Sequence, residues 1–164
     1  MANHFSQLAK KSRTNGSSEK IAKEQTGKPS LDIYKLGDDV LRQNSKRITK
    51  VDESIRKLAR EMLQSMYAAK GIGLAAPQIG INKELLVIDV NFEDSAAEPL
   101  ILINPEITDF GTTLNSYEEG CLSIPGVYLN VVRPSTIKLK FRDEMGRPRK
   151  MKADGLLARC IQHE

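Results

Sequence analysis

The dipeptide His163-Glu164 combines a metal-binding side chain with a general base. It opens the pattern His-Glu-x-x-His, in which two histidines on one helical face bind a metal and the glutamate activates the water bound to it. The second histidine would fall three residues beyond Glu164, and the only other histidine of the chain is His4. A single His-Glu pair is common by chance, so it needs partners elsewhere. Cys160 precedes His163 by three residues, which leaves a Cys-x-x-His ligand pair open as an alternative.

Cys121 is the second candidate ligand, and it lies in the segment Glu118-Glu119-Gly120-Cys121-Leu122-Ser123-Ile124-Pro125-Gly126. Its acidic neighbours and the lack of a local cation predict a raised thiol pKa, which argues against an activated nucleophile. A bound metal ion would reverse this, because it deprotonates the thiol that binds it. A buried structural cysteine is the alternative. Cys121 and Cys160 are both expected to be free thiols.

The third segment is Gly71-Ile72-Gly73-Leu74-Ala75-Ala76-Pro77-Gln78. Two glycines around one apolar residue allow a backbone to approach a ligand closely. Gln78 ends the segment with an amide that can donate a hydrogen bond. The alternative is that Gly71 only ends a helix and that the two alanines only pack.

Two helices are expected to position these segments. Asp52 is a suitable N-cap, and apolar residues recur at helical spacing from Ile55 to Met66, with Gly71 where a C-cap glycine is expected. Asp154 is expected to cap a second amphipathic helix, over residues 155–164, that contains the His-Glu pair.

Strand patterns occupy most of the sequence outside these helices. They are Leu31–Leu36, Leu85–Val90, Leu100–Asn104, Tyr128–Val132, Thr136–Arg142 and Arg149–Lys152. Pro105 is expected to end the third of them and Pro134 lies just beyond the fourth. A helix followed by antiparallel strands and a second helix predicts an α+β fold.

The net charge of +4 is confined to residues 1–30, which hold six basic and two acidic side chains. Residues 31–164 hold 19 of each sign, so we expect no nucleic-acid-binding face there. The first 30 residues lack large apolar side chains and are predicted to form a disordered basic extension, with one domain over 31–164. A transit peptide or an arm that contacts polyanions is the alternative for the extension.

No apolar run could span a bilayer and no secretory signal is present, which predicts a cytoplasmic protein, with a plastid location as the alternative.

Together and in this order, the three segments resemble the signature motifs of the peptide deformylases. Gly71–Gln78 and Glu119–Ser123 match in full, and Gln162–Glu164 matches as far as it extends. The resemblance runs from about Leu31 to the last residue. The segment Gly126–Val131 is most similar to the plastid and cyanobacterial branch of the family.

The resemblance implies antiparallel sheets packed around a C-terminal metal-binding helix, and hydrolytic removal of the N-formyl group from formyl-Met nascent peptides with release of formate. Cys121 and His163 would bind Fe²⁺, with Zn²⁺, Ni²⁺ or Co²⁺ as substitutes. Glu164 would transfer protons, and the Gln78 amide and Leu122 backbone N–H would stabilise an oxyanion. The residues implied near the substrate are Ile72, Gly73, Tyr117, Glu119, Gly120, Arg159 and Cys160. The implied partners are nascent chains near the ribosome, with no membrane and no specific nucleic acid, and the sequence does not indicate an oligomeric state.

The absent second histidine departs from the family pattern. We therefore expect a copy truncated within the third motif that binds metal weakly, because such sites normally have three or four protein ligands. A non-catalytic deformylase-like domain that binds peptides is the main alternative. A zincin protease and an RNA-binding module that works through the basic tail are two others.

Overall fold

The structure, a computed structural model, describes residues 30–164, and it has the predicted α+β architecture. The predicted disordered extension therefore lies outside the described residues, apart from Ser30. The helices are α1 (Glu53–Ala68), α2 (Gly155–His163) and the short 3₁₀ helices η1 (Asp39–Arg42) and η2 (Ala76–Ile79). The strands are β1 (Gly73–Ala75), β2 (Leu85–Ile88), β3 (Leu100–Phe110), β4 (Leu114–Cys121), β5 (Ile124–Pro134), β6 (Thr136–Arg142) and β7 (Pro148–Asp154).

Helix α1 begins as its sequence predicts. The Asp52 carboxylate accepts hydrogen bonds from the backbone N–H groups of Ser54 and Ile55, at 3.0 and 3.3 Å, which satisfies two of the otherwise unpaired donors of the first turn. The apolar stripe is buried as expected, and its members are Ile55, Ala59, Met62, Leu63 and Met66. Burial of this stripe holds α1 against the sheet.

The end of α1 differs from the prediction, because Lys70 and not Gly71 adopts the left-handed conformation, with φ of 57°. The Gly71 N–H donates to the Met66 carbonyl and the Lys70 N–H to the Tyr67 carbonyl, the two bonds of a Schellman motif. Gly71 is needed for a different reason. A Cβ atom there would lie 2.6 Å from Cδ1 of Leu122, so the missing side chain lets two of the signature segments approach each other.

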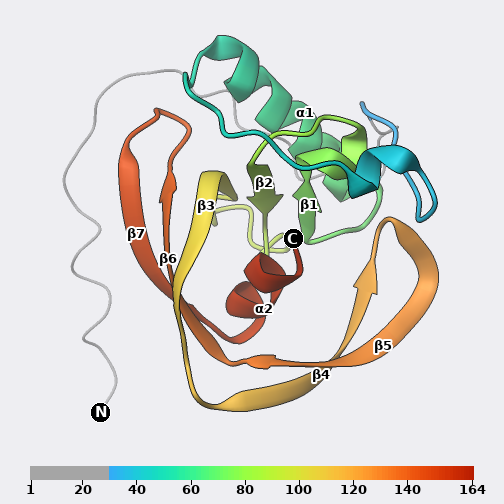
Figure 1. Cartoon of the computed structure of the whole chain (residues 1–164), viewed down its shortest axis with the longest axis vertical. Helices are drawn as coiled ribbons and strands as arrows, with labels where there is room; N and C mark the ends of the chain where they lie inside the picture. The colour runs from blue at the N-terminus through green and yellow to red at the C-terminus, as the bar shows by residue number, and fades with distance from the viewer. Residues whose placement is uncertain (1–29) are drawn as a thin grey trace.

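Strands β1, β2, β3, β6 and β7 form one antiparallel sheet in the order β1-β2-β3-β6-β7. The side chains of β2 alternate between its two faces. Leu85 and Val87 pack in the cluster with α1, whereas Leu86 and Ile88 pack in the cluster with α2. The two helices therefore lie on opposite faces of the sheet, and α2 lies near the middle of the molecule (Figure 1).

Strands β4 and β5 form a separate two-stranded sheet, which we call the arm. The arm extends beside α2 on the side away from β7 (Figure 1). It carries Cys121 at the end of β4, where the register shifts between Gly120 and Cys121. Strand β5 is longer than the predicted Tyr128–Val132, and it runs to Pro134 because a proline is tolerated at the end of an edge strand.

Two local predictions are wrong and a third is confirmed only in position. Leu31–Leu36 forms no strand, since its backbone bonds go to two different places: Tyr34 N–H to the Gln78 carbonyl and Leu36 N–H to the Ser123 carbonyl. Pro105 does not end β3, because Asn104, with φ of 51°, and a register shift accommodate it. Asp154 is the N-cap residue of α2, as predicted, but its side chain makes no capping hydrogen bond. Across residues 30–164, no helix is long and apolar enough to cross a bilayer.

Candidate active site

Cys121 and His163 come from different elements and line the same groove. Cys121 is the last residue of β4 and His163 is the last residue of α2. A hydrogen bond between thiol and imidazole raises the pKa of His163 to about 9, against the opposing effect of burial. The two side chains that the sequence assigns to metal binding are thus brought together, 42 residues apart in the chain.

The electrostatics of Cys121 differ from the sequence-based expectation. The hydrogen bond with His163 lowers the pKa of the Cys121 thiol, and a backbone N–H of Ser123 acts in the same direction. Acidic sequence neighbours had predicted a raised pKa. The difference arises because the cation that stabilises the thiolate comes from α2, which sequence proximity does not reveal. Thiolate is the form of cysteine that binds metals.

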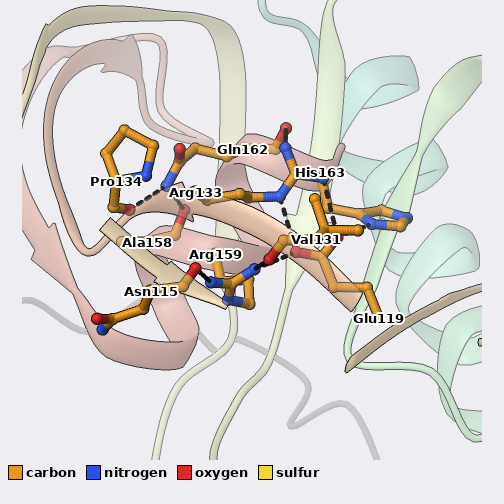
Figure 2. A network of polar contacts seen from close by, with 9 residues as sticks. All are labelled: Asn115, Glu119, Val131, Arg133, Pro134, Ala158, Arg159, Gln162 and His163. Carbon is orange, nitrogen blue, oxygen red and sulfur yellow. Dashed lines mark hydrogen bonds and ion pairs between the residues drawn. The ribbon is translucent and has the colours of Figure 1, made fainter. Parts of the chain in front are cut away.

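Glu119 contacts the His163 ring and is the centre of a polar network (Figure 2). Its carboxylate lies 2.9 Å from Nδ1 of His163 and accepts two bonds from the Arg133 guanidinium, at 2.7 and 2.8 Å. Arg159 donates a further bond of 2.6 Å. The Arg133 guanidinium, then His163 and Arg159, lower the pKa of Glu119 to about 2. The ionised carboxylate fixes the orientation of the imidazole ring.

Glu164 and Cys160 meet at Gly73. A Cβ atom on Gly73 would lie 2.6 Å from both the Cys160 sulfur and a Glu164 carboxylate oxygen, so only glycine fits between them. Burial raises the pKa of the Glu164 carboxyl to about 7, and nearby His163 opposes this shift. A carboxyl with a pKa near neutrality can both accept and donate a proton. Burial also raises the pKa of the Cys160 thiol, which therefore stays protonated.

Gln78 is held in place by both ends of its amide. Its oxygen accepts a bond of 2.8 Å from the Ala75 N–H, and its nitrogen donates to the Ser123 hydroxyl at 3.1 Å. The same nitrogen lies 3.7 Å from the Cys121 sulfur. The Leu122 carbonyl accepts a bond of 2.8 Å from Lys35 Nζ, which fixes the chain beside Cys121. The Gln78 side-chain amide and the Leu122 backbone, the two predicted oxyanion donors, are therefore held by hydrogen bonds next to Cys121.

A groove of about 590 Å³ runs past these groups. All seven residues predicted near the substrate line it: Ile72, Gly73, Tyr117, Glu119, Gly120, Arg159 and Cys160. Cys121, Leu122, His163 and Glu164 line it as well, whereas Gln78 is buried and does not line it. Sequence reasoning missed Arg133, because only the register that pairs it with Asn115 on the arm brings it near Glu119. It also missed Leu156 and Tyr128, whose exposed side chains had no distinguishing pattern.

The side chains of Cys121 and His163 are of the chemical types that bind divalent metals. A thiolate and an imidazole are the ligands that zinc and iron prefer. Within residues 30–164, however, no group of three or more histidine, cysteine or acidic side chains is arranged to hold an ion. The described residues therefore supply two donors, Cys121 and His163, where such sites normally have three or four.

Comparison with known proteins decides the family. The family model described as polypeptide deformylase matches residues 30–164. The chain belongs to the peptide deformylase family. It is 98% identical over all 164 residues to a peptide deformylase of Prochlorococcus marinus strain AS9601, and 96% identical to that of strain MIT 9312, and it covers 82% of the length of each. A crystal structure of a peptide deformylase from Synechococcus elongatus in complex with actinonin is similar with a TM-score of 0.87 and 56% identity, over 90% of this chain and 80% of that chain.

The prediction of a peptide deformylase, a hydrolase of protein biosynthesis that acts on formyl-Met nascent peptides, is thereby confirmed. The deformylase relatives do not favour the non-catalytic alternative, and family membership makes the zincin protease interpretation wrong. The expectations of truncation and of weak metal binding stay predictions. The roles assigned to the individual site residues also stay predictions.

Proposed function

We propose that this chain removes the formyl group from formyl-Met peptides with Cys121 and His163 as protein ligands of a divalent ion, Fe²⁺ by preference and Zn²⁺, Ni²⁺ or Co²⁺ as substitutes. The observation that carries the proposal is the convergence of a thiol, an imidazole and a carboxyl in one groove. Cys121, His163 and Glu164 come from β4 and the end of α2, and all three line the groove of about 590 Å³. The chemistry that the ion supplies when bound is Lewis acidity, which lets water ionise near neutral pH.

Glu164 is the proton-transfer group of this proposal. Its carboxyl, with a pKa of about 7, can take a proton from the attacking water and later give it to the departing amine. The overall reaction cleaves the formyl C–N bond, adds water, and releases formate and a free amino terminus. Gly73 leaves the space in which the Glu164 carboxylate sits.

Gln78 and Leu122 are the proposed oxyanion donors. The Gln78 amide nitrogen lies within 3.7 Å of the Cys121 sulfur, and its oxygen is anchored to the Ala75 N–H. A fixed donor needs no reorganisation as negative charge develops, and each such donor typically contributes about 3 kcal/mol to catalysis.

We propose that the substrate peptide binds as an added strand along β1. Strand β1 is at one end of the five-stranded sheet, so one of its edges is free of sheet partners among the described strands. Gly73 begins β1, and the opposite wall of the groove is formed by residues 117–122 of the arm. Backbone hydrogen bonds from such an edge hold a peptide regardless of its side chains. This suits an enzyme that processes many different nascent chains as they leave the ribosome.

Formate release from a formyl-Met tripeptide tests the proposal. The full chain, loaded anaerobically with Fe²⁺, is expected to release formate, and Glu164→Gln is expected to lower kcat at least about 100-fold, the usual size of a general acid–base effect. Glu144→Gln, a change of the same kind in the exposed turn before Gly146, is the matched control. Formate release that is equal in the wild type and Glu164→Gln would contradict the assignment. Peptide binding without formate release would favour the non-catalytic alternative.

A further inference from the structure

The β6–β7 hairpin carries a local excess of basic side chains. Residues 136–152 contain seven basic and two acidic side chains, although residues 31–164 as a whole contain 19 of each. The neutral total led to the expectation of no nucleic-acid-binding face, but a total does not show where in space the charges lie. The hairpin lies at the side of the molecule away from the arm (Figure 1).

Five of these cations share one face of the hairpin, which we call the basic face: Lys138, Lys140, Arg142, Lys150 and Lys152. The register sets Lys138 opposite Lys152 and Lys140 opposite Lys150. Ile137 and Leu139, on the other face, are buried under α2, so the basic face points away from the core. Like charges directly opposite each other destabilise a strand pair. The fold tolerates this cost along the whole hairpin.

Charge compensation on the basic face is incomplete. Lys138 and Lys140 pair with Asp109 and Glu106 of β3, at 2.8 and 3.0 Å. No carboxylate of residues 30–164 lies within ion-pair distance of Lys150 or Lys152, and both side chains are exposed. The outer strand of the hairpin therefore presents two unneutralised cations at a spacing of about 7 Å.

A hollow of about 400 Å³ opens at one end of the basic face. Five cationic side chains from three chain segments line it, and none of its lining residues is acidic: Arg47, Lys140, Arg142, Arg149 and Lys150. Arg47, Lys140 and Arg149 also have carboxylate partners outside the lining, Glu84, Glu106 and Asp143. Of the five cations, Arg142 and Lys150 therefore have no carboxylate partner among residues 30–164.

The Arg142 guanidinium is fixed by two hydrogen bonds to backbone carbonyls. Its Nε donates to the Gly146 carbonyl at 2.9 Å and its Nη1 to the Thr49 carbonyl at 3.1 Å. These bonds fix the guanidinium without neutralising it, and a fixed guanidinium fork matches a phosphate group. A row of cations with such a guanidinium at its end can follow the successive phosphates of a nucleic-acid strand.

We propose that the basic face and the hollow at its end bind the phosphate backbone of single-stranded RNA. The contacts are to phosphates, so the binding is independent of base sequence. The groove of the active site shares no residue with this surface, so a chain bound to RNA can still admit a peptide. This inference does not depend on the proposed catalytic roles, since RNA binding is measured without turnover.

The test uses the full chain and a fluorescein-labelled 20-nucleotide RNA, with fluorescence anisotropy across a series of KCl concentrations. Lys150→Glu/Lys152→Glu is expected to weaken binding about tenfold or more, and to reduce the slope of log K against log salt by about 1.4, the contribution of two phosphate contacts. Lys150→Gln/Lys152→Gln is expected to show the same loss in slope with smaller risk to the fold. Lys57→Glu/Arg60→Glu on α1, with the same change in net charge as the Glu pair, is expected to retain most of the affinity and the full slope.

Equal RNA affinity in the wild type and both hairpin variants would overturn the proposal, and would assign any binding to another part of the chain. A loss in the α1 control as large as that in the hairpin variant would overturn it too, because net charge alone would then explain the result. Binding to anionic phospholipid vesicles that requires Lys150 and Lys152, without RNA binding, would identify a membrane surface instead. Circular dichroism of each variant confirms that the fold is retained.

Discussion

At the scale of single residues, Glu119 links the metal-binding candidate to the scaffold. One carboxylate contacts the His163 ring, the Arg133 guanidinium and the Arg159 guanidinium. Its side chain is only 8% exposed, so these bonds are screened little by water. A buried carboxylate that orients a ligating imidazole is a recurrent feature of metal sites, and it affects affinity without touching the ion.

Substitution of Glu119 is expected to weaken metal binding specifically. Glu119→Gln keeps the shape but removes the charge that orients His163, so the affinity for Co²⁺ is expected to fall about 10- to 100-fold. Isothermal titration calorimetry measures this directly. Glu118→Gln is the matched control, because Glu118 lies on the opposite face of β4 and its side chain is exposed. An equal loss of affinity in both variants would refute the role of Glu119.

At the scale of elements, the arm depends on α2 for its position. Strands β4 and β5 pair with each other but with no strand of the other sheet. Arg159 of α2 bridges both: it bonds to Glu119 and to the Asn115 carbonyl on β4, and to the Val131 carbonyl on β5, at 2.6, 2.7 and 2.9 Å. Since the arm carries Cys121, this bridge sets one wall of the groove.

Removal of this bridge is expected to loosen the arm more than the main sheet. Arg159→Met leaves buried acceptors unpaired and is expected to lower the free energy of unfolding by about 3 kcal/mol. Hydrogen exchange should accelerate most at the amides of β4 and β5. Arg47→Met, at a guanidinium that is 64% exposed, is expected to change stability by less than about 1 kcal/mol. Uniform acceleration across both sheets would show that Arg159 is not specific to the arm.

The turn between β6 and β7 makes stability depend on pH. The Asp143 carboxylate accepts bonds from the backbone N–H groups of Met145 and Arg147 and from the side chains of Arg147 and Arg149. Burial acts to raise the pKa of Asp143, but these bonds outweigh it and the pKa lies below the ordinary value of 3.8. A lowered folded-state pKa stabilises the protein above the unfolded-state value, and this stabilisation is lost as pH falls through the folded-state value.

Asp143→Asn should therefore destabilise the protein by about 1–2 kcal/mol at pH 7. The difference from the wild type should shrink at pH 3, because the Asp143 carboxyl then takes up a proton in the unfolded state, whose pKa is the ordinary 3.8, and the stabilisation by the charge declines. Urea denaturation at the two pH values measures both quantities. A difference that is as large at pH 3 as at pH 7 would contradict the assigned role of the charge.

At the scale of the whole molecule, sequence patterns predicted local features well and long-range features only through resemblance. The N-cap Asp52 and strand β6 follow from neighbours within a few residues, and both are confirmed. The continuation of β3 through Pro105 depends on a bulge opposite β6, which local sequence does not specify.

The candidate site shows the same division. The family resemblance named the residues that line the groove, but not the Arg133–Glu119–His163 network, which requires the arm and α2 to meet. The basic face was missed because a count of charges says nothing of their segregation in space. The raised pKa expected for Cys121 was wrong for a similar reason, since its partner His163 is distant in sequence.

Cobalt binding followed by absorption spectroscopy tests most directly whether Cys121 and His163 share an ion. Thiolate ligation of Co²⁺ produces a sulfur-to-metal charge-transfer band in the near ultraviolet. With two protein donors, we expect the band to appear only as Co²⁺ is added in excess, to disappear in Cys121→Ser, to weaken in His163→Ala and to persist in Cys160→Ser. No band at saturating Co²⁺, or a band that requires Cys160 and survives Cys121→Ser, would contradict the proposed metal site.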